Sequence, residues 1–210
     1  MIDCPRSAAD WARVREICCE TGLPGGRPIE PERREFFAEY WIGPYQRICP
    51  DWTWVARDDS GEVIGYLTAA PRTEAFNRAR FWRCHLAWVA AITFRRYSAT
   101  VDTRRFMREF TARQSRPEER FPGLSQCGAL RDFPAHLHMN LTASARGKRA
   151  GTALLNALAG RLCEEGIHGA HLVCGAGPVG FYSKQGFETL EQVEVAPGIP
   201  IFAMGRRWPN

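Results

Sequence analysis

The sequence predicts an α/β (α+β) fold in which a mixed central sheet of about six or seven strands is flanked by helices. Segments of alternating apolar residues, typical of half-buried strands, occur in both halves of the chain, and segments with helical apolar spacing lie between them. The 210 residues suit one domain, and no repeat or low-complexity segment divides them. We therefore expect a single domain over residues 1–210, with a long insertion at about residues 71–133.

Two helices are expected near the amino terminus. Ser7 and Asp10 have the spacing of a capping box, and apolar residues of one helical face follow until the glycine-rich stretch 22–26. Glu32–Trp41 forms a second predicted helix, which Pro44 is expected to end because proline cannot continue a helix.

A β-hairpin and the insertion come next. Trp54–Ala56 and Val63–Ala69 are rich in β-forming residues, and the turn cluster 58–61 joins them. Within 71–133 no clean period appears, although Arg104–Arg113 fits a basic helix. Residues 72–131 hold thirteen arginines against five acids, so this segment carries a formal charge of +8. Such a charge attracts anions or nucleic acid, or forms a solvated surface.

Regular patterns return at Pro134. The strand His136–Leu141 places Leu137 and Met139 on one face and the histidines on the other. The loop 146–152 is rich in glycine and basic residues, and it precedes a helix with leucines along one side. The remaining predicted elements are a strand at His171–Cys174, a short helix at Gly180–Lys184, and two antiparallel strands at Phe187–Val195 and Ile199–Met204.

The apolar runs and the cysteine pattern of the sequence predict a soluble protein. The amino terminus carries no secretory signal, and the longest apolar run, Leu86–Phe94, is about half the length of a spanning helix. The eight cysteines follow no regular framework, which favours reduced thiols. We therefore expect a cytoplasmic protein without a membrane partner.

A strand followed by a glycine-rich basic loop and a helix is suited to bind phosphate, because the first N–H groups of the helix have no internal partner. Here the pattern Arg-Gly-Lys-x-x-Gly-Thr-x-Leu-Leu at 146–155 is followed by Phe-Tyr-x-x-x-Gly-Phe at 181–187. This arrangement resembles the GNAT superfamily of N-acetyltransferases. The resemblance implies a GNAT fold with the insertion before the fourth strand, acetyl-CoA as co-substrate, and transfer of its acetyl group to a primary amine by direct attack on the thioester.

A narrower resemblance involves residues 133–139 and 180–184, which are similar to the acetyltransferase-like carboxy-terminal domain of O-GlcNAcase and its free-standing bacterial relatives. It implies an alternative function, a catalytically weak or inactive CoA-binding pseudo-acetyltransferase that acts as an interaction domain. Two departures from the GNAT pattern stand out. Arg149 replaces a glycine of the phosphate loop, and Gly175 and Pro178 replace an asparagine and an alanine. If position 149 requires a positive φ, an arginine there costs on the order of 1 kcal/mol.

The resemblance also implies which residues bind the co-substrate. Main-chain groups of Leu141 and Ala143 are expected to pair with the pantetheine arm, and the loop with the pyrophosphate. The predicted cofactor-binding residues are Leu141, Thr142, Ala143, Arg146, Gly147, Lys148, Arg149, Ala150, Gly151, Thr152, Phe181 and Tyr182.

Candidate catalytic residues are Tyr182, His138 and Asn140. Tyr182 matches the tyrosine that protonates the CoA thiolate in many family members; the alternative is a tyrosine that only packs its ring. His138, with an ordinary pKa near ~6.5, would accept the amine proton directly or through water. The alternative is an ordinary polar strand face. No metal is expected, because no third or fourth ligand follows at a recognisable spacing.

The sequence does not specify the acceptor amine. We expect acetyl-CoA and an amine as partners, with a homodimer as one use of the arginine-rich insertion. Nucleic acid is the weaker alternative, resting only on the +8 segment.

Overall fold

The computed structural model describes residues 1–23, 26–94, 100–114, 121 and 129–208. Seven strands form one sheet in the order β1-β2-β3-β4-β5-β7-β6. They are β1 (Ile2–Asp3), β2 (Thr53–Arg57), β3 (Val63–Ala70), β4 (Ala135–Leu141), β5 (Gly169–Gly175), β6 (Glu188–Ala196) and β7 (Ile199–Arg207). The β4–β5 pair is parallel, and the other pairs are antiparallel. The predicted mixed sheet of six or seven strands is confirmed.

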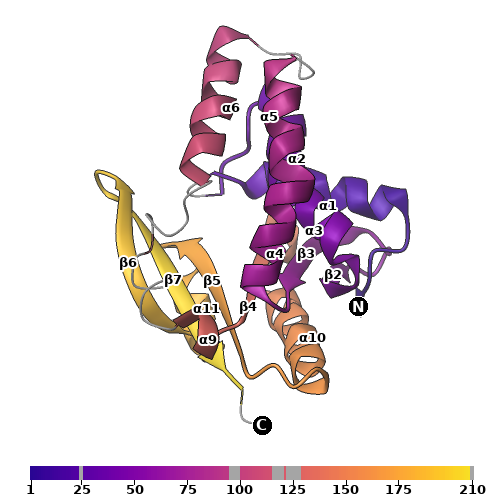
Figure 1. Cartoon of the computed structure of the whole chain (residues 1–210). Helices are drawn as coiled ribbons and strands as arrows, with labels where there is room; N and C mark the ends of the chain where they lie inside the picture. Colours follow the sequence, from indigo (N-terminus) through magenta and orange to yellow (C-terminus); the bar gives the residue numbers. More distant parts are fainter. Residues whose placement is uncertain (24–25, 95–99, 115–120, 122–128, 209–210) are drawn as a thin grey trace.

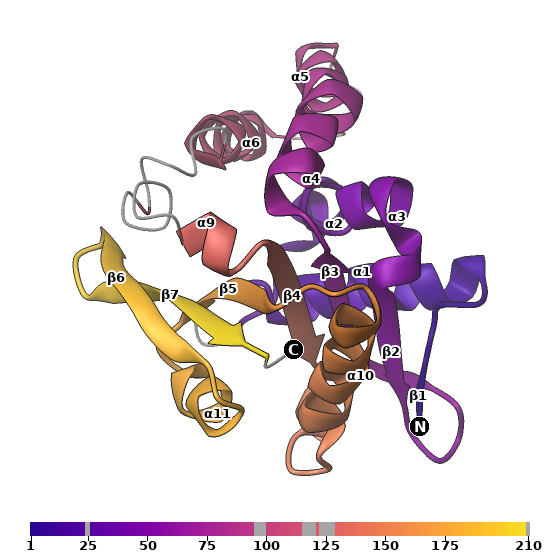
Figure 2. The ribbon, with the colours of Figure 1, turned by 60° about the horizontal axis from the view of Figure 1, so that its bottom comes forward.

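One face of the sheet packs on α10 (Ala150–Glu164). Leu154, Leu158 and Leu162 of this helix are fully buried against residues such as Leu67 and Leu137 of the strands. These leucines recur at helical spacing, so one side of α10 is apolar, as the sequence predicts. Gly166, with φ 65°, ends the helix in the left-handed conformation that glycine adopts without strain. Figure 2 shows α10 crossing the sheet beside β4.

The opposite face packs on α1 (Ala8–Thr21) and α2 (Arg34–Trp41), with Val14 and Phe37 among the buried contacts. The capping box at Ser7 and Asp10 is present as predicted. The prediction that Pro44 ends the second helix is wrong. α2 ends at Trp41, and Pro44 lies in the first turn of α3 (Gly43–Ile48), where the missing N–H of proline costs nothing.

The insertion is mainly helical in its described part. It contains α4 (Thr73–Arg80), a π-helical turn η3 (Phe81–His85), α5 (Leu86–Thr93), α6 (Val101–Gln114) and α9 (Ala129–Asp132). The predicted basic helix corresponds to α6. Figure 1 shows α5 and α6 side by side, projecting from the sheet. They pack on α2 through a small apolar cluster of Phe36, Tyr40, Cys84, Trp88, Ile92 and Met107.

The remaining elements are short. They are η1 (Pro31–Arg33), η2 (Pro50–Trp52), η4 (Ala143–Ala145) and α11 (Val179–Lys184). All seven cysteines among the described residues are free thiols. In the described part of the chain, every helix is too short or too polar to cross a bilayer.

Candidate functional site

Strands β4 and β5 pair only at their first residues. The parallel register joins Ala135 to Ala170 and His136 to His171, and no later pair follows within 129–208. Each strand nevertheless keeps its other neighbour along most of its length, β3 for β4 and β7 for β5. In Figure 2 the β5–β7–β6 part of the sheet turns away from the β1–β4 part. The two central strands therefore part in the middle of an otherwise continuous sheet.

The far end of β4 presents its main chain to this opening. Thr142 donates its N–H to the carbonyl of Ile64 (2.9 Å) on the β3 side. Because successive residues of a strand direct their main-chain groups to opposite sides, Met139 and Leu141 direct theirs toward β5. Among the described residues, β5 pairs with β4 only near its start, so the main-chain groups of Met139 and Leu141 have no partner on β5. An extended amide-containing ligand can pair with them as an added strand does.

The loop after β4 contains two residues with positive φ, Gly147 (76°) and Arg149 (58°). Arg149 is the sole non-glycine residue with positive φ among those described. The expected strain at this position is therefore present, on the order of 1 kcal/mol. The side chain of Arg149 is exposed.

Helix α10 begins directly after this loop without a side-chain cap. The first helical bond within it is donated by Ala153 to the carbonyl of Arg149. Among the described residues, the N–H groups of Ala150, Gly151 and Thr152 have no hydrogen-bond acceptor. Together with the helix dipole, such groups favour an anion. Exposed basic side chains surround them: Arg146, Lys148 and Arg149. The described geometry therefore fits a phosphate-bearing ligand.

Gly151 lies at a close packing contact. A Cβ at this position would lie 2.9 Å from Cζ of Phe181 and 3.2 Å from Cδ1 of Leu141. A glycine is therefore required at this position because α11 packs on α10, and the contact of Gly151 with the co-substrate stays a prediction. At Gly147, by contrast, a Cβ would meet no atom within 4 Å, so its positive φ explains the glycine.

Thr142 and Ala143 shape the start of the loop. The hydroxyl of Thr142 bonds to the carbonyl of Ile64 and to Oγ of Ser144, each at 2.9 Å. Its polar groups are thus occupied within the protein, so its contribution is to hold the loop against β3. Ala143 begins the 3₁₀ turn η4 and accepts a hydrogen bond from the N–H of Arg146.

Tyr182 lies on α11 and is buried. Its ring contacts Phe181 and Phe187, with centroids 5.2 and 5.6 Å away. Burial, together with the nearby thiol of Cys174, raises the pKa of Tyr182 above its ordinary value. The phenol therefore keeps its proton at neutral pH. A thiol in the same dry surroundings also gains a higher pKa, so the difference between the two acids decides whether Tyr182 can protonate a thiolate.

His138 and Asn140 lie on the face of β4 opposite α10, as predicted. Asn140 donates from Nδ2 to the hydroxyl oxygen of Tyr66 (3.0 Å) and approaches Nε2 of His138 (3.4 Å). The Tyr66 hydroxyl also bonds to the thiol of Cys18. Because Asn140 donates to Nε2, the His138 ring carries its proton on Nδ1. A chain of polar groups thus connects the strand to α1.

The surroundings of His138 lower its basicity. The ring stacks on Trp41, with centroids 5.3 Å apart and an interplanar angle of 9°. Desolvation lowers the pKa of His138 to about 4. The pKa near ~6.5 that the sequence suggested is therefore wrong for this form of the protein, since the tertiary environment removes water from the ring.

Two other histidines lie nearby, His171 buried and His136 half-buried. His136 bonds to Oγ1 of Thr73 (3.0 Å), and His171 bonds through Nδ1 to the carbonyl of Phe133 (2.8 Å). Burial lowers the pKa of both, for His136 with a further contribution from His171. These hydrogen bonds occupy ring nitrogens, so His136 and His171 serve the structure where β4 and β5 still pair.

Two residues of this site were not predicted from sequence, Trp41 and Tyr66. Trp41 was assigned only to an apolar helix face, and Tyr66 only to a strand. The register that pairs Tyr66 with Asn140 could have indicated the second of these contacts once the β3–β4 pairing was known. The stacking of Trp41 on His138 has no local signal in the sequence.

No family model matches the sequence. Solved structures nevertheless share its architecture. The structure of SsHAT matches 100% of this chain and 98% of its own, with a TM-score of 0.73 at 24% identity. A GCN5-related N-acetyltransferase from Kribbella flavida matches 99% and 97%, with a TM-score of 0.53 at 14% identity.

A third similar structure is the mosquito arylalkylamine N-acetyltransferase like 5b. It matches 99% of this chain and 99% of its own, with a TM-score of 0.57 at 13% identity. All three comparisons extend over the seven-stranded sheet, including the strands that part. The chain therefore has the fold of the GCN5-related N-acetyltransferases, as the sequence predicted.

Proposed function

We propose that this protein is an acetyl-CoA-dependent N-acetyltransferase that moves an acetyl group to a primary amine by direct attack on the thioester. The observation that carries the proposal is the parting of β4 and β5 directly before a helix whose first N–H groups lack acceptors. This combination places an extended main-chain edge directly before an anion-binding site along the chain. A pantetheine arm joined to a pyrophosphate requires both.

The comparisons support the type of reaction. Two of the similar structures are named as N-acetyltransferases, and one of these is an arylalkylamine N-acetyltransferase by name. An amine acceptor is therefore the natural expectation for this chain.

The co-substrate side uses groups that the loop and β4 already orient. Met139 and Leu141 would bond the amides of the pantetheine arm, and the N–H groups at 150–152 would bond the pyrophosphate. Lys148 and Arg149 would add positive charge at the loop surface. Bound in this way, acetyl-CoA supplies an activated acyl carbon and a thiolate leaving group. Fixing both reactants in one geometry can contribute several kcal/mol to the barrier reduction.

The acceptor side is assigned to β4 and α11. His138 is neutral near pH 7, since its pKa is about 4, and it would take the proton of the attacking amine directly or through water. The basic nitrogen of the ring is Nε2, so the amine proton would displace the 3.4 Å contact from Asn140, whose amide would stay bonded to the hydroxyl of Tyr66. Tyr182 would return a proton to the departing thiolate, with Cys174 and the neighbouring aromatic rings excluding water.

The test is a transfer assay that follows release of free CoA thiol, with tryptamine, glucosamine and a peptide α-amine as acceptors. Tyr182→Phe should lower kcat by about 100-fold if the phenol acts as the acid, while acetyl-CoA affinity changes little. His138→Ala should lower kcat by at least about tenfold on the same argument. Affinity is measured separately by calorimetry, so that binding and turnover are distinguished.

Two outcomes would contradict the proposal. Tight acetyl-CoA binding without thiol release for any acceptor would favour a non-catalytic CoA-binding domain. Transfer that neither substitution changes would leave the reaction in place and remove the roles of Tyr182 and His138.

A further inference from the structure

The helical hairpin α4–α6 exposes several large apolar side chains. Trp82 is 67% exposed, Leu86 is 50% exposed and Phe94 is 82% exposed. Other exposed apolar residues of the hairpin are Phe81, Val89 and Val101. Isolated exposed apolar residues are common, but a contiguous group marks a surface that meets another apolar phase.

Four of these residues lie close together along η3 and α5. Phe81, Trp82, Leu86 and Val89, here called the apolar stripe, are exposed, in contrast to the buried residues of the same helices. The buried residues are Phe76, Cys84, Trp88 and Ile92. The π-helical turn η3 joins the two α-helices and shifts the register of the apolar residues within Thr73–Thr93. These helices therefore carry both packed and exposed apolar residues.

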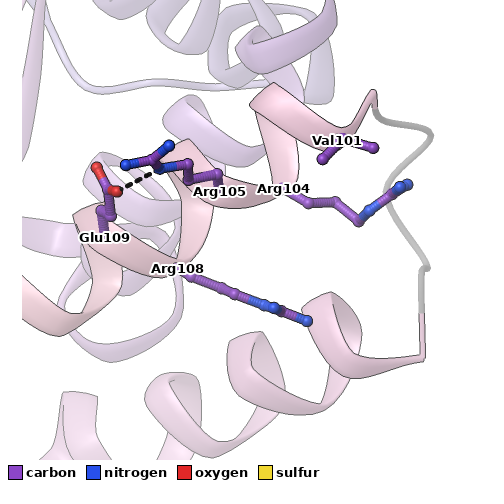
Figure 3. A pocket seen from close by; sticks show the side chains of 5 residues that line it. All are labelled: Val101, Arg104, Arg105, Arg108 and Glu109. Carbon is purple, nitrogen blue, oxygen red and sulfur yellow. Dashed lines mark hydrogen bonds and ion pairs between the residues drawn. The ribbon is translucent and has the colours of Figure 1, made fainter.

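Basic side chains accompany the apolar stripe. The helical segments 73–94 and 101–114 contain seven arginines and three acids. A surface hollow of about 420 Å³ on α6 is lined by Val101, Arg104, Arg105, Arg108 and Glu109. Figure 3 shows Arg108 extending from α6 toward α5, while Arg105 bonds to Glu109 (2.8 Å). We call this the arginine hollow.

We propose that the projecting hairpin docks on an anionic lipid surface. The apolar stripe would enter the boundary between headgroups and acyl chains, and the arginine hollow would bind lipid phosphates. Tryptophan and phenylalanine on η3, combined with arginines on the adjoining helix α6, resemble the combination that interfacial helices use. The helical segment from Phe81 to Phe94 is roughly 20 Å long, so several lipids would contact it.

The basic charge and the exposed apolar residues of the hairpin favour a lipid surface over a second copy of the chain or a nucleic acid. A second copy of the chain would bring two basic hairpins together, and their repulsion opposes a dimer at this surface. Nucleic acid would satisfy the arginines but would leave Leu86, Val89 and Val101 exposed to water. From the sequence we expected no membrane partner because Leu86–Phe94 is too short to span a bilayer. Peripheral docking needs no such length.

Vesicle co-sedimentation tests the proposal. The full chain is mixed with vesicles of phosphatidylcholine alone or of equal parts phosphatidylcholine and phosphatidylglycerol. Two double variants are compared, W82S/L86S in the apolar stripe and R105Q/R108Q in the arginine hollow. Ile199→Ser serves as the matched control, because Ile199 is an exposed apolar residue (38%) on β7, outside the hairpin.

We expect binding to the anionic vesicles that is at least tenfold tighter than to neutral ones and that weakens in 0.5 M NaCl, as screening requires (a Debye length of about 4 Å). Each double variant should bind at least tenfold more weakly, while the control binds as the native chain does. Thermal unfolding of each variant confirms that it is folded. Equal binding to both vesicle types, or unchanged binding of both double variants, would overturn the proposal. So would a dimer without lipid that W82S/L86S converts to monomer in analytical ultracentrifugation.

Discussion

The two halves of the candidate site use different chemical groups. The co-substrate half consists of main-chain groups at the end of β4 and the start of α10, and its loop side chains are exposed. The acceptor half consists of side chains that other elements desolvate, as Trp41 does for His138. The co-substrate half therefore depends on backbone conformation, whereas the acceptor half depends on packing between distant segments. Substitutions should therefore affect them in different ways.

The largest effect is expected where α10 meets α11. Gly151→Val would force a side chain against Phe181 and Leu141. We expect the free energy of unfolding to fall by about 1–3 kcal/mol, as for other overpacked sites. Displacement of the helix start should also weaken acetyl-CoA binding by about 100-fold, corresponding to two lost charge-assisted hydrogen bonds of about 1.5 kcal/mol each.

Gly160→Val is the control, because this glycine lies in the same helix and a Cβ there meets no atom within 4 Å. Calorimetry and thermal unfolding measure both quantities. If the two variants behave alike, packing against Phe181 is not what fixes the helix start.

The next effect is a pH dependence of stability. Burial lowers the pKa of His138 to about 4, and it also lowers those of His136 and His171. Between pH 6.5 and 4 the unfolded chain then binds more protons than the folded one, so stability is lost as pH falls through this window. His138 alone would account for up to about 3 kcal/mol.

His138→Gln should make this loss shallower in denaturant titrations at pH 7, 6, 5 and 4.5. His168→Gln, at an exposed histidine, is the comparison. An unchanged slope for His138→Gln would mean that His138 titrates alike in the folded and unfolded chain.

A smaller effect is expected at Tyr66. Tyr66→Phe removes the hydroxyl between Asn140 and Cys18, so the Asn140 amide loses a buried acceptor. The expected cost is about 1–2 kcal/mol of unfolding free energy. The freed amide should also let the His138 ring reorient, which lowers kcat more than acetyl-CoA affinity. A loss confined to co-substrate affinity would argue against this connection.

The smallest effect concerns the strained loop residue. Arg149→Gly relieves a positive φ that arginine adopts at a cost, and it should raise the unfolding free energy by about 1 kcal/mol. Arg146→Gly removes the same charge at a residue with φ −65° and should not stabilise the protein. Thermal unfolding of the pair separates conformation from charge. Destabilisation by Arg149→Gly would indicate that its side chain makes a contact that outweighs the strain.

Much of the co-substrate half could be predicted from sequence, because its signals are local. The glycines, the basic residues and the leucine spacing of 146–162 lie in one continuous stretch, and the departure at Arg149 pointed to the positive φ observed there. The role of Gly151 was not predictable, since it depends on Phe181 thirty residues later.

The insertion and the acceptor half could be predicted only in part. The π-helical turn at 81–85 shifts the register of apolar residues, so the period of α4 and α5 was not recognised. For His138 the sequence indicated the correct strand face but not its pKa, because the desolvating ring belongs to α2. Pairing between remote segments, not local propensity, decides such quantities.

Amide hydrogen exchange with and without acetyl-CoA tests the central claim most directly, because it observes the main-chain nitrogens themselves. The account predicts that the amides of Leu141 and of residues 150–152 exchange rapidly in the free protein and at least about tenfold more slowly with saturating acetyl-CoA. The Thr142 amide, already bonded to Ile64, should be protected in both states. Slowed exchange elsewhere with no change at Leu141 and 150–152 would contradict it.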